Sequence, residues 1–183
     1  MIHAIRDVGG HGGLGSRRHE RYRAAFDRVM DCVEKEYYLE AIAILDSLIC
    51  DRLSSRLAYV MGSDVDLYWT CPWLCGKLLG KDPPKNARCE KDQDFRNAVR
   101  DIQKWADRRN EALHSTAKVL RSDTSRLNFA AILRSHRKDA VDGIKYLQVF
   151  DALDTKSRAS VGKKPASYPN AFLPKRSRTR SRR

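Results

Sequence analysis

The sequence predicts an all-α protein, a bundle of four to five helices with a disordered basic tail at its C-terminus. Apolar residues recur at three- and four-residue spacing through most of the chain, and no segment shows the sustained alternation of a strand. Hydrophobic residues make up 42% of the 183 residues, which is sufficient for one buried core. We expect three parts: a flexible glycine-rich leader over residues 1–15, the bundle over 16–154 and the tail over 155–183.

The first two predicted helices follow each other closely. From Ser16 onward one helical face is apolar, with Tyr22, Phe26, Val29, Met30 and Val33 at helical spacing. A second helix is expected in "YYLEAIAILDSLICDRLSSRLAYVMG", with Gly62 as its stop. Because the connection is short, the two helices should lie antiparallel.

The remaining helices are predicted to follow a non-helical segment. Residues 63–90 contain several prolines and glycines, which favour a loop with at most a short helical turn. A third helix should run from about Asp92 to Ala117, with either a kink or a fresh start at Asn110. A fourth is expected over residues 123–153, with Ser122 or Asp123 as its N-cap and a buried stripe that includes Val141, Leu147 and Phe150.

The positive charge is concentrated in the tail. Residues 155–183 hold ten Lys or Arg and no Asp or Glu, and subtracting them from the net charge of +13 leaves only +3 for residues 1–154. Such a segment cannot offset its chain entropy by burial, so we expect it to be disordered. Its expected partners are nucleic acids first, acidic proteins or membrane surfaces second; a role in solubility alone is the alternative. The residues expected to bind nucleic acid are Lys175, Arg176, Arg178, Arg180, Arg182 and Arg183.

Composition also bears on location and metal content. No apolar run of about 18 residues is present, and the N-terminal segment lacks the pattern of a secretion signal, so we expect a cytoplasmic protein without a membrane partner. Five cysteines then indicate free thiols. Cys71, Cys75 and Cys89 do not match a usual zinc motif, because the spacing in "CPWLC" is one residue too long and no fourth ligand stands at a matching distance. We therefore expect neither a metal nor another cofactor.

Within the third helix, "RRNEALH" gathers groups suited to phosphodiester chemistry. Asn110 and His114 are four residues apart and share one helical face, and the long side chain of Arg109 can reach the same patch. If a new helix began at Asn110, its N-terminus would also favour an anion there. A histidine transfers protons near neutral pH, and an arginine stabilises the negative charge that develops on phosphate oxygens. The alternative is a solvated helix surface on which these residues meet by chance.

The stretch from Arg109 to His114 resembles the motif of HEPN domains, in which Arg and a polar residue such as Asn are followed by His after four to six intervening residues. The upstream "EYYLEAIAILDSLICDRLSSRL" is similar to an early helix of these small all-α domains. The resemblance covers roughly residues 20–153. It implies a metal-independent endoribonuclease of the toxin–antitoxin or phage-defence type, acting on RNA as a homodimer and controlled by an antitoxin or inhibitor protein.

The resemblance also implies roles for individual residues. Arg109 would stabilise the scissile phosphate, His114 would be the acid–base group, and Asn110 would orient them. Some related toxins carry a tyrosine two residues after the histidine; Thr116 stands there in this chain, which puts control by tyrosine modification in doubt.

Two charged residues fall on the apolar face of the second helix. Asp46 and Arg52 lie among apolar residues, where a charge is costly unless it is paired. Asp46 either holds Arg109 or His114 in the site or forms an internal salt bridge. His3, His11, His19 and His136 have no comparable neighbours and are expected to be solvated or structural.

Two other functions are consistent with the sequence. One is a non-catalytic HEPN-like module for dimerisation and nucleic-acid binding. The other is a nucleic-acid-packaging protein in which the motif is a coincidence, and a monomeric state in solution would favour it.

Overall fold

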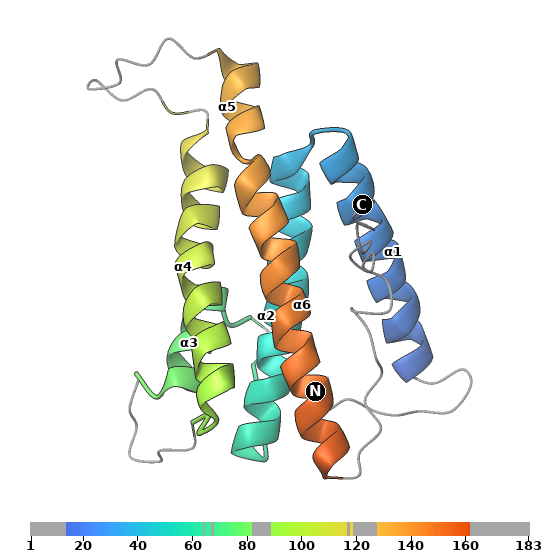
Figure 1. The fold of residues 1–183 in the computed structure, drawn as a ribbon, viewed down its shortest axis with the longest axis vertical. Helices are drawn as coiled ribbons and strands as arrows, with labels where there is room; N and C mark the ends of the chain where they lie inside the picture. Colours follow the sequence, from blue (N-terminus) through green and yellow to red (C-terminus); the bar gives the residue numbers. More distant parts are fainter. Residues whose placement is uncertain are drawn as a thin grey trace, which may run out of the picture.

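A computed structural model describes residues 14–63, 65–66, 68–81, 89–116, 118 and 128–161. Its described residues form six helices and no strand, so the predicted all-α bundle is confirmed (Figure 1). Four helices are long: α1 (Leu14–Glu34), α2 (Tyr38–Met61), α4 (Gln93–Ser115) and α6 (Arg137–Ser160). Two are short: α3 (Cys71–Leu79) and α5 (Phe129–Ser135).

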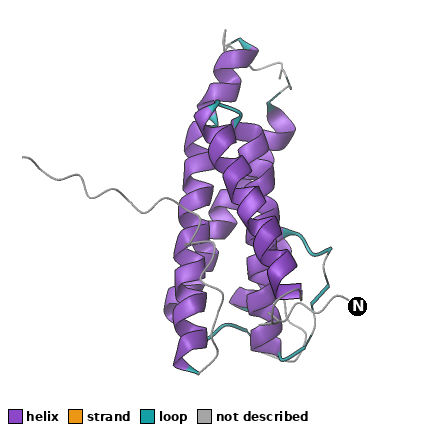
Figure 2. Cartoon of the chain, turned by 90° about the vertical axis from the view of Figure 1, so that its right-hand side faces the viewer, coloured by secondary structure: helices purple, strands orange, loops and turns teal. Residues whose placement is uncertain are grey.

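The four long helices alternate in direction. Figure 1 shows α1 and α4 rising where α2 and α6 descend, so the antiparallel packing expected for the first two helices is confirmed. Helix α2 contacts each of the other five described helices and is the centre of the fold. Figure 2 shows that the helices pack side by side along one long axis. Short α3 lies against α2 and α4, whereas α5 continues the line of α6.

Aromatic side chains fill the core between the long helices. Phe26 of α1, Phe95 and Trp105 of α4, and Phe150 of α6 are almost completely buried. The Phe95 and Phe150 rings meet edge to face, with centroids 5.6 Å apart, which is a favourable geometry for aromatic pairs. The Trp105 Nε1–H donates to the carbonyl oxygen of Asp139 at 2.8 Å, so its one polar atom is satisfied inside the bundle.

Local signals account for several helix ends. Gly62 ends α2 with φ 70°, in the left-handed region that glycine adopts without strain, and this confirms the predicted stop. The Asp92 carboxylate caps α4 by accepting from the backbone N–H groups of Asp94 and Phe95. The caps expected at Ser122 or Asp123 lie outside the described residues, and α5 begins instead after Asn128, whose side chain accepts from the Ala131 N–H.

The described part of residues 63–90 is more helical than the sequence indicated. Instead of a single turn, it contains the nine-residue helix α3. Pro72 stands in its first turn, where proline is tolerated, and Gly80 ends it with φ 71°. Pro72 and Gly80 therefore bound this helix rather than exclude it. Its buried face packs against α2 and α4 through Leu74, Leu78 and Leu79.

The fourth predicted helix is divided, and it ends later than expected. His136 separates α5 from α6, and Val141 is 42% exposed rather than buried. Helix α6 continues to Ser160, so the boundary predicted between residues 154 and 155 is wrong by six residues: the segment 155–160, expected in the disordered tail, is helical. Its Arg158 is 5% exposed, because it pairs with Asp154 and is neutralised inside the bundle. Residues 162–183 lie outside the described part of the chain.

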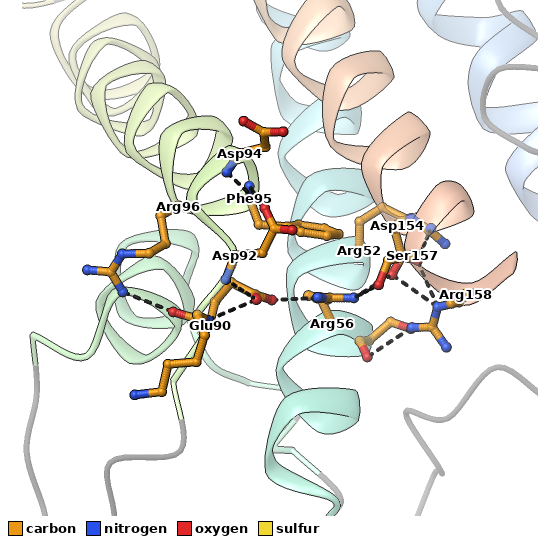
Figure 3. A network of polar contacts seen from close by, with 12 residues as sticks. Arg52, Arg56, Glu90, Asp92, Asp94, Phe95, Arg96, Asp154, Ser157 and Arg158 are labelled. Atoms are coloured by element: carbon orange, nitrogen blue, oxygen red, sulfur yellow. Dashed lines mark hydrogen bonds and ion pairs between the residues drawn. The ribbon is translucent and has the colours of Figure 1, made fainter. Parts of the chain in front are cut away.

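A buried ionic network fastens the end of α6 to α2 (Figure 3). Arg52, which the sequence placed on an apolar face, is 2% exposed and lies 2.5 Å from Asp151 and 2.9 Å from Asp154. One turn later, Arg56 lies 2.6 Å from Glu90, the residue that leads into α4. The Arg56 guanidinium also stacks 3.7 Å from the centroid of the Phe95 ring. The charges in this network face one another and neighbouring backbone, and Figure 3 shows them converging between three segments of the chain.

The tight packing of α6 against α4 gives a prediction at Gly143. A Cβ added there would lie 2.9 Å from Trp105 Cζ2 and 3.1 Å from Leu45 Cδ1, both in the core. Gly143→Ala should therefore lower the free energy of unfolding by about 1–3 kcal/mol, although alanine is ordinarily the better helix former. Urea denaturation measures the change.

Gly76 provides the matched control for this substitution. It is also helical, but a Cβ added there would meet no atom within 4 Å. Gly76→Ala should raise the free energy of unfolding by up to about 1 kcal/mol through helix propensity. Equal effects of the two substitutions would contradict the close approach of α6 to Trp105.

Candidate functional site

The structure brings Asp46 and Arg109 together between α2 and α4. Arg109 Nη2 lies 2.7 Å from Asp46 Oδ1, and the two side chains are 11% and 26% exposed. Of the two partners considered for Asp46, Arg109 is the one it contacts. An ion pair of this kind serves equally as a structural link and as a holder for a phosphate-binding arginine.

The Arg109 guanidinium is oriented by two contacts. Besides the ion pair, its Nη1 donates to Asn110 Oδ1 at 2.8 Å. Its Nε is buried and has no hydrogen-bond partner among the described residues. A buried donor without a partner is uncommon in native structures, and this one is enclosed by the protein.

Helix α4 runs through the motif without a break. The fresh start considered at Asn110 does not occur, because α4 extends from Gln93 to Ser115. Arg109 therefore lies well inside the helix and gains nothing from a helix N-terminus. Asn110 and His114 do share a face, one turn apart, as the spacing predicted.

His114 is exposed in the last turn of α4. Within the described part of the chain, no hydrogen bond or ion pair involves its imidazole. The ring is thus accessible to a substrate or to a second copy of the chain.

Burial dominates the electrostatics of Asp46. Desolvation raises the pKa of this carboxyl above its ordinary value, and the positive charge of Arg109 opposes the shift without cancelling it. The Cys50 thiol also donates to Asp46 Oδ1 at 3.9 Å, one turn along α2. The carboxylate is therefore held in a partly desolvated position beside a single described cation.

This shift predicts a pH dependence of stability. Because the folded-state pKa of Asp46 is above its unfolded value, the protonated carboxyl favours the folded state, and that contribution is lost as the pH rises through the folded-state pKa. Asp46→Asn removes the titration while keeping an oxygen that accepts from Arg109. The difference in unfolding free energy between wild type and Asp46→Asn should fall as the pH rises just above the ordinary Asp range and then level off. Urea midpoints of the metal-free protein measured across that range test this, and parallel pH curves would contradict it.

The neighbouring Arg108 is structural. Its Nε lies 2.7 Å from Asp139 and its Nη2 lies 3.1 Å from Asp142, both on α6. It therefore links α4 to α6, whereas Arg109 links α4 to α2.

His136 and Thr116 also form a structural contact. Thr116 Oγ1 lies 3.0 Å from His136 Nε2, and the other ring nitrogen is 4.0 Å from Asp139. The structural alternative expected for His136 is thus supported. Thr116 is buried and donates to the Ala112 carbonyl oxygen, so it closes the end of α4.

The remaining predicted site residues cannot be placed. The six basic residues expected to bind nucleic acid, Lys175, Arg176, Arg178, Arg180, Arg182 and Arg183, lie outside the described residues, as does the leader up to residue 13.

Sequence reasoning missed one cluster. It considered Cys71, Cys75 and Cys89 as metal ligands, but not Cys50, which lies on another helix. In the fold, the ligand atoms of Asp46, Cys50 and Cys71 lie within 4.8 Å of one another. The available signal was the four-residue spacing of Asp46 and Cys50 on one helix, repeated by Cys71 and Cys75 on the next.

The comparisons with known proteins found no match among family models, curated proteins or solved structures. Among the described residues, none of the helices has the length and apolar character needed to cross a bilayer.

Proposed function

We propose that this chain is a metal-independent endoribonuclease of the HEPN type, with a composite Arg/His site formed by a homodimer. The observation that carries the proposal is the Asp46–Arg109 ion pair, which fixes an arginine beside Asn110 and next to the turn that bears His114. A positioned cation and an accessible imidazole are the groups required to cleave RNA by its own 2′-hydroxyl.

The proposed reaction uses one histidine from each of two copies. His114 of one copy takes the proton of the 2′-hydroxyl, and the 2′-oxygen forms a bond to phosphorus. The bond from phosphorus to the 5′-oxygen breaks, and His114 of the second copy gives a proton to that oxygen. The products are a 2′,3′-cyclic phosphate and a 5′-hydroxyl, and no co-reactant is needed.

Arg109 would stabilise the negative charge on the non-bridging oxygens during this step. A guanidinium has five N–H donors, more than the contacts to Asp46 and Asn110 use. Asp46 acts as a positioning residue, because it orients Arg109 and does not touch the phosphate.

The basic tail would add affinity for RNA without sequence preference. A cytoplasmic location and control by an antitoxin or inhibitor protein belong to the same proposal.

A gel assay with purified protein, RNA and EDTA tests this function. Cleavage should survive the chelator, leave a 2′,3′-cyclic phosphate and disappear in His114→Ala. Cleavage that is unchanged by His114→Ala would overturn the site assignment.

A non-catalytic HEPN-like module is the second candidate, and one observation favours it. Arg109 turns toward α2 and is largely paired, whereas His114 is exposed without a described partner, so a single copy does not hold the two side chains against each other. This module would retain RNA or DNA without turnover, and Arg109→Ala combined with His114→Ala would bind as wild type does. Binding should weaken strongly with salt and on deletion of residues 162–183. A deletion from residue 155 would be unsuitable, because it removes the buried Arg158.

A further inference from the structure

Three potential metal ligands converge where α3 packs on α2, and a fourth lies one turn away. Asp46 and Cys50 are one turn apart on α2, and Cys71 and Cys75 are one turn apart on α3. The oxygen of Asp46 and the sulfurs of Cys50 and Cys71 lie within 4.8 Å of one another, and Cys50 Sγ is 3.9 Å from Asp46 Oδ1. Cys75 is completely buried on the same helix as Cys71 and is the candidate for the fourth ligand.

These distances are close to those of an occupied tetrahedral site. Zinc bonds of ~2.0–2.3 Å place neighbouring ligand atoms roughly 3.5–3.8 Å apart. The 3.9 Å between Cys50 Sγ and Asp46 Oδ1 is already close to this separation, and a rotamer adjustment of about 1 Å would bring in the Cys71 sulfur.

Charge compensation at this cluster would come from the bound ion. Arg109 is the described cation beside the cluster, and it pairs with Asp46. The sulfurs bind a metal as thiolates, and a divalent ion makes this possible at neutral pH by displacing the thiol protons.

We propose that Asp46, Cys50, Cys71 and Cys75 form a structural zinc site that fastens α3 to α2. A set of thiolates with one carboxylate selects a soft or borderline ion such as Zn²⁺ over Mg²⁺ or Ca²⁺. The ligands together carry more negative charge than the ion neutralises. Arg109 offsets part of this excess negative charge and pairs with the ligating carboxylate of Asp46. Residues that bind a metal ligand without touching the metal commonly orient that ligand in this way.

This site lies beyond the proposed nuclease and does not depend on it. The ion would hold α2 and α3 together and would not contact the phosphodiester. The sequence showed no zinc motif because the cysteines in and after α3 do not form one by themselves. The other ligands, Asp46 and Cys50, come from α2.

Cobalt titration tests the site directly. Full-length protein, reduced and freed of metal, is titrated with Co²⁺ and followed by visible absorption. A single ion per chain should give thiolate-to-cobalt charge-transfer bands and the d–d bands of tetrahedral Co²⁺, and Zn²⁺ should remove them. Cys50→Ser and Cys71→Ser should lose most of this signal. Cys89→Ser is the matched control and should keep it, because Cys89 contacts Gly80 and Lys91 instead of the cluster.

Two variants distinguish a loss of metal binding from a failure to fold. Cys50 is only partly buried, so Cys50→Ser should fold even if a change at fully buried Cys71 does not. Asp46→Asn should weaken Co²⁺ binding while the thiolate bands persist. Circular dichroism of each metal-free variant verifies its helical content.

Three results would overturn the zinc site. One is the absence of tetrahedral bands in folded, reduced wild type. Another is a signal that persists in both Cys50→Ser and Cys71→Ser. The third is a disulfide between Cys50 and Cys71 that survives mild reduction and occupies the position instead of metal.

The cobalt signal is measured without RNA, so its outcome is separate from that of the nuclease assay. The effect of EDTA on cleavage is interpreted together with a melting curve recorded in EDTA. If cleavage is lost only when the protein also unfolds, the loss reflects removal of the structural zinc. Cleavage lost from a protein that stays folded would contradict metal-independent chemistry and leave the zinc site standing.

Discussion

Replacing Asp154 with alanine should lower the free energy of unfolding by about 3–5 kcal/mol, the cost of leaving buried charges without their partner. Asp154 is 1% exposed and is shared by three arginines: Arg52 at 2.9 Å, Arg158 at 3.0 Å and Arg56 at 3.7 Å. Its removal leaves guanidinium groups inside the bundle with too little negative charge around them (Figure 3).

Urea denaturation of wild type, Asp154→Ala and Asp154→Asn measures this effect. The asparagine variant keeps hydrogen-bond acceptance but loses the charge, so its stability should fall between the other two. Lys138→Ala is the control, because it removes an exposed ion pair with Asp142 and should leave the midpoint essentially unchanged. An Asp154→Ala midpoint equal to wild type would contradict the buried network.

His114→Ala should reduce RNA cleavage by about 10²–10⁴-fold, the usual contribution of a positioned general acid–base group. The loss should appear in the cleavage rate rather than in RNA affinity, because the imidazole moves protons and does not supply the main positive charge. Single-turnover rates at saturating protein separate the two quantities. His114 is exposed in the last turn of α4, so the substitution should leave the melting temperature unchanged.

Glu111→Ala is the matched control for this experiment. Glu111 lies in the same six-residue stretch and is also exposed, but it has no role in the proposed reaction. Its rate should match that of wild type. A mixture of wild-type and His114→Ala chains adds a test of the dimer: the proposed reaction needs a histidine from each copy, so mixed dimers should be inactive. Cleavage should therefore fall more steeply than the fraction of wild-type chains, whereas a rate proportional to that fraction, or a monomer at assay concentration, would contradict the shared site.

How much of this fold the sequence predicts depends on how far along the chain each sequence signal acts. Periodicity identified all four long helices, and Gly62 marked the end of α2, because these signals act within a few turns of one helix. Helix α3 was missed, since proline and glycine were taken to exclude a helix where they bound one. The end of α6 was missed for a different reason: a basic composition suggested solvation, but Arg158 has a buried partner one turn earlier.

The candidate site also divides into features that the local sequence predicts and contacts between helices that it does not. Spacing alone placed Asn110 and His114 on one face, and the apolar surroundings of Asp46 and Arg52 indicated charges that need partners. Nothing local named those partners. Arg52 meets Asp151 and Asp154 about a hundred residues later in the chain, and Asp46 meets Arg109 from α4.

The sequence by itself determined that this chain is helical, where its long helices lie and that Asp46 and Arg52 fall on an apolar face, because hydrophobic periodicity is a property of each helix alone. Only the tertiary structure decided that Asp46 pairs with Arg109, that three arginines share Asp154, and that Cys50 joins Cys71. Those contacts depend on how separate helices are packed and in which register, and no short stretch of sequence records that packing.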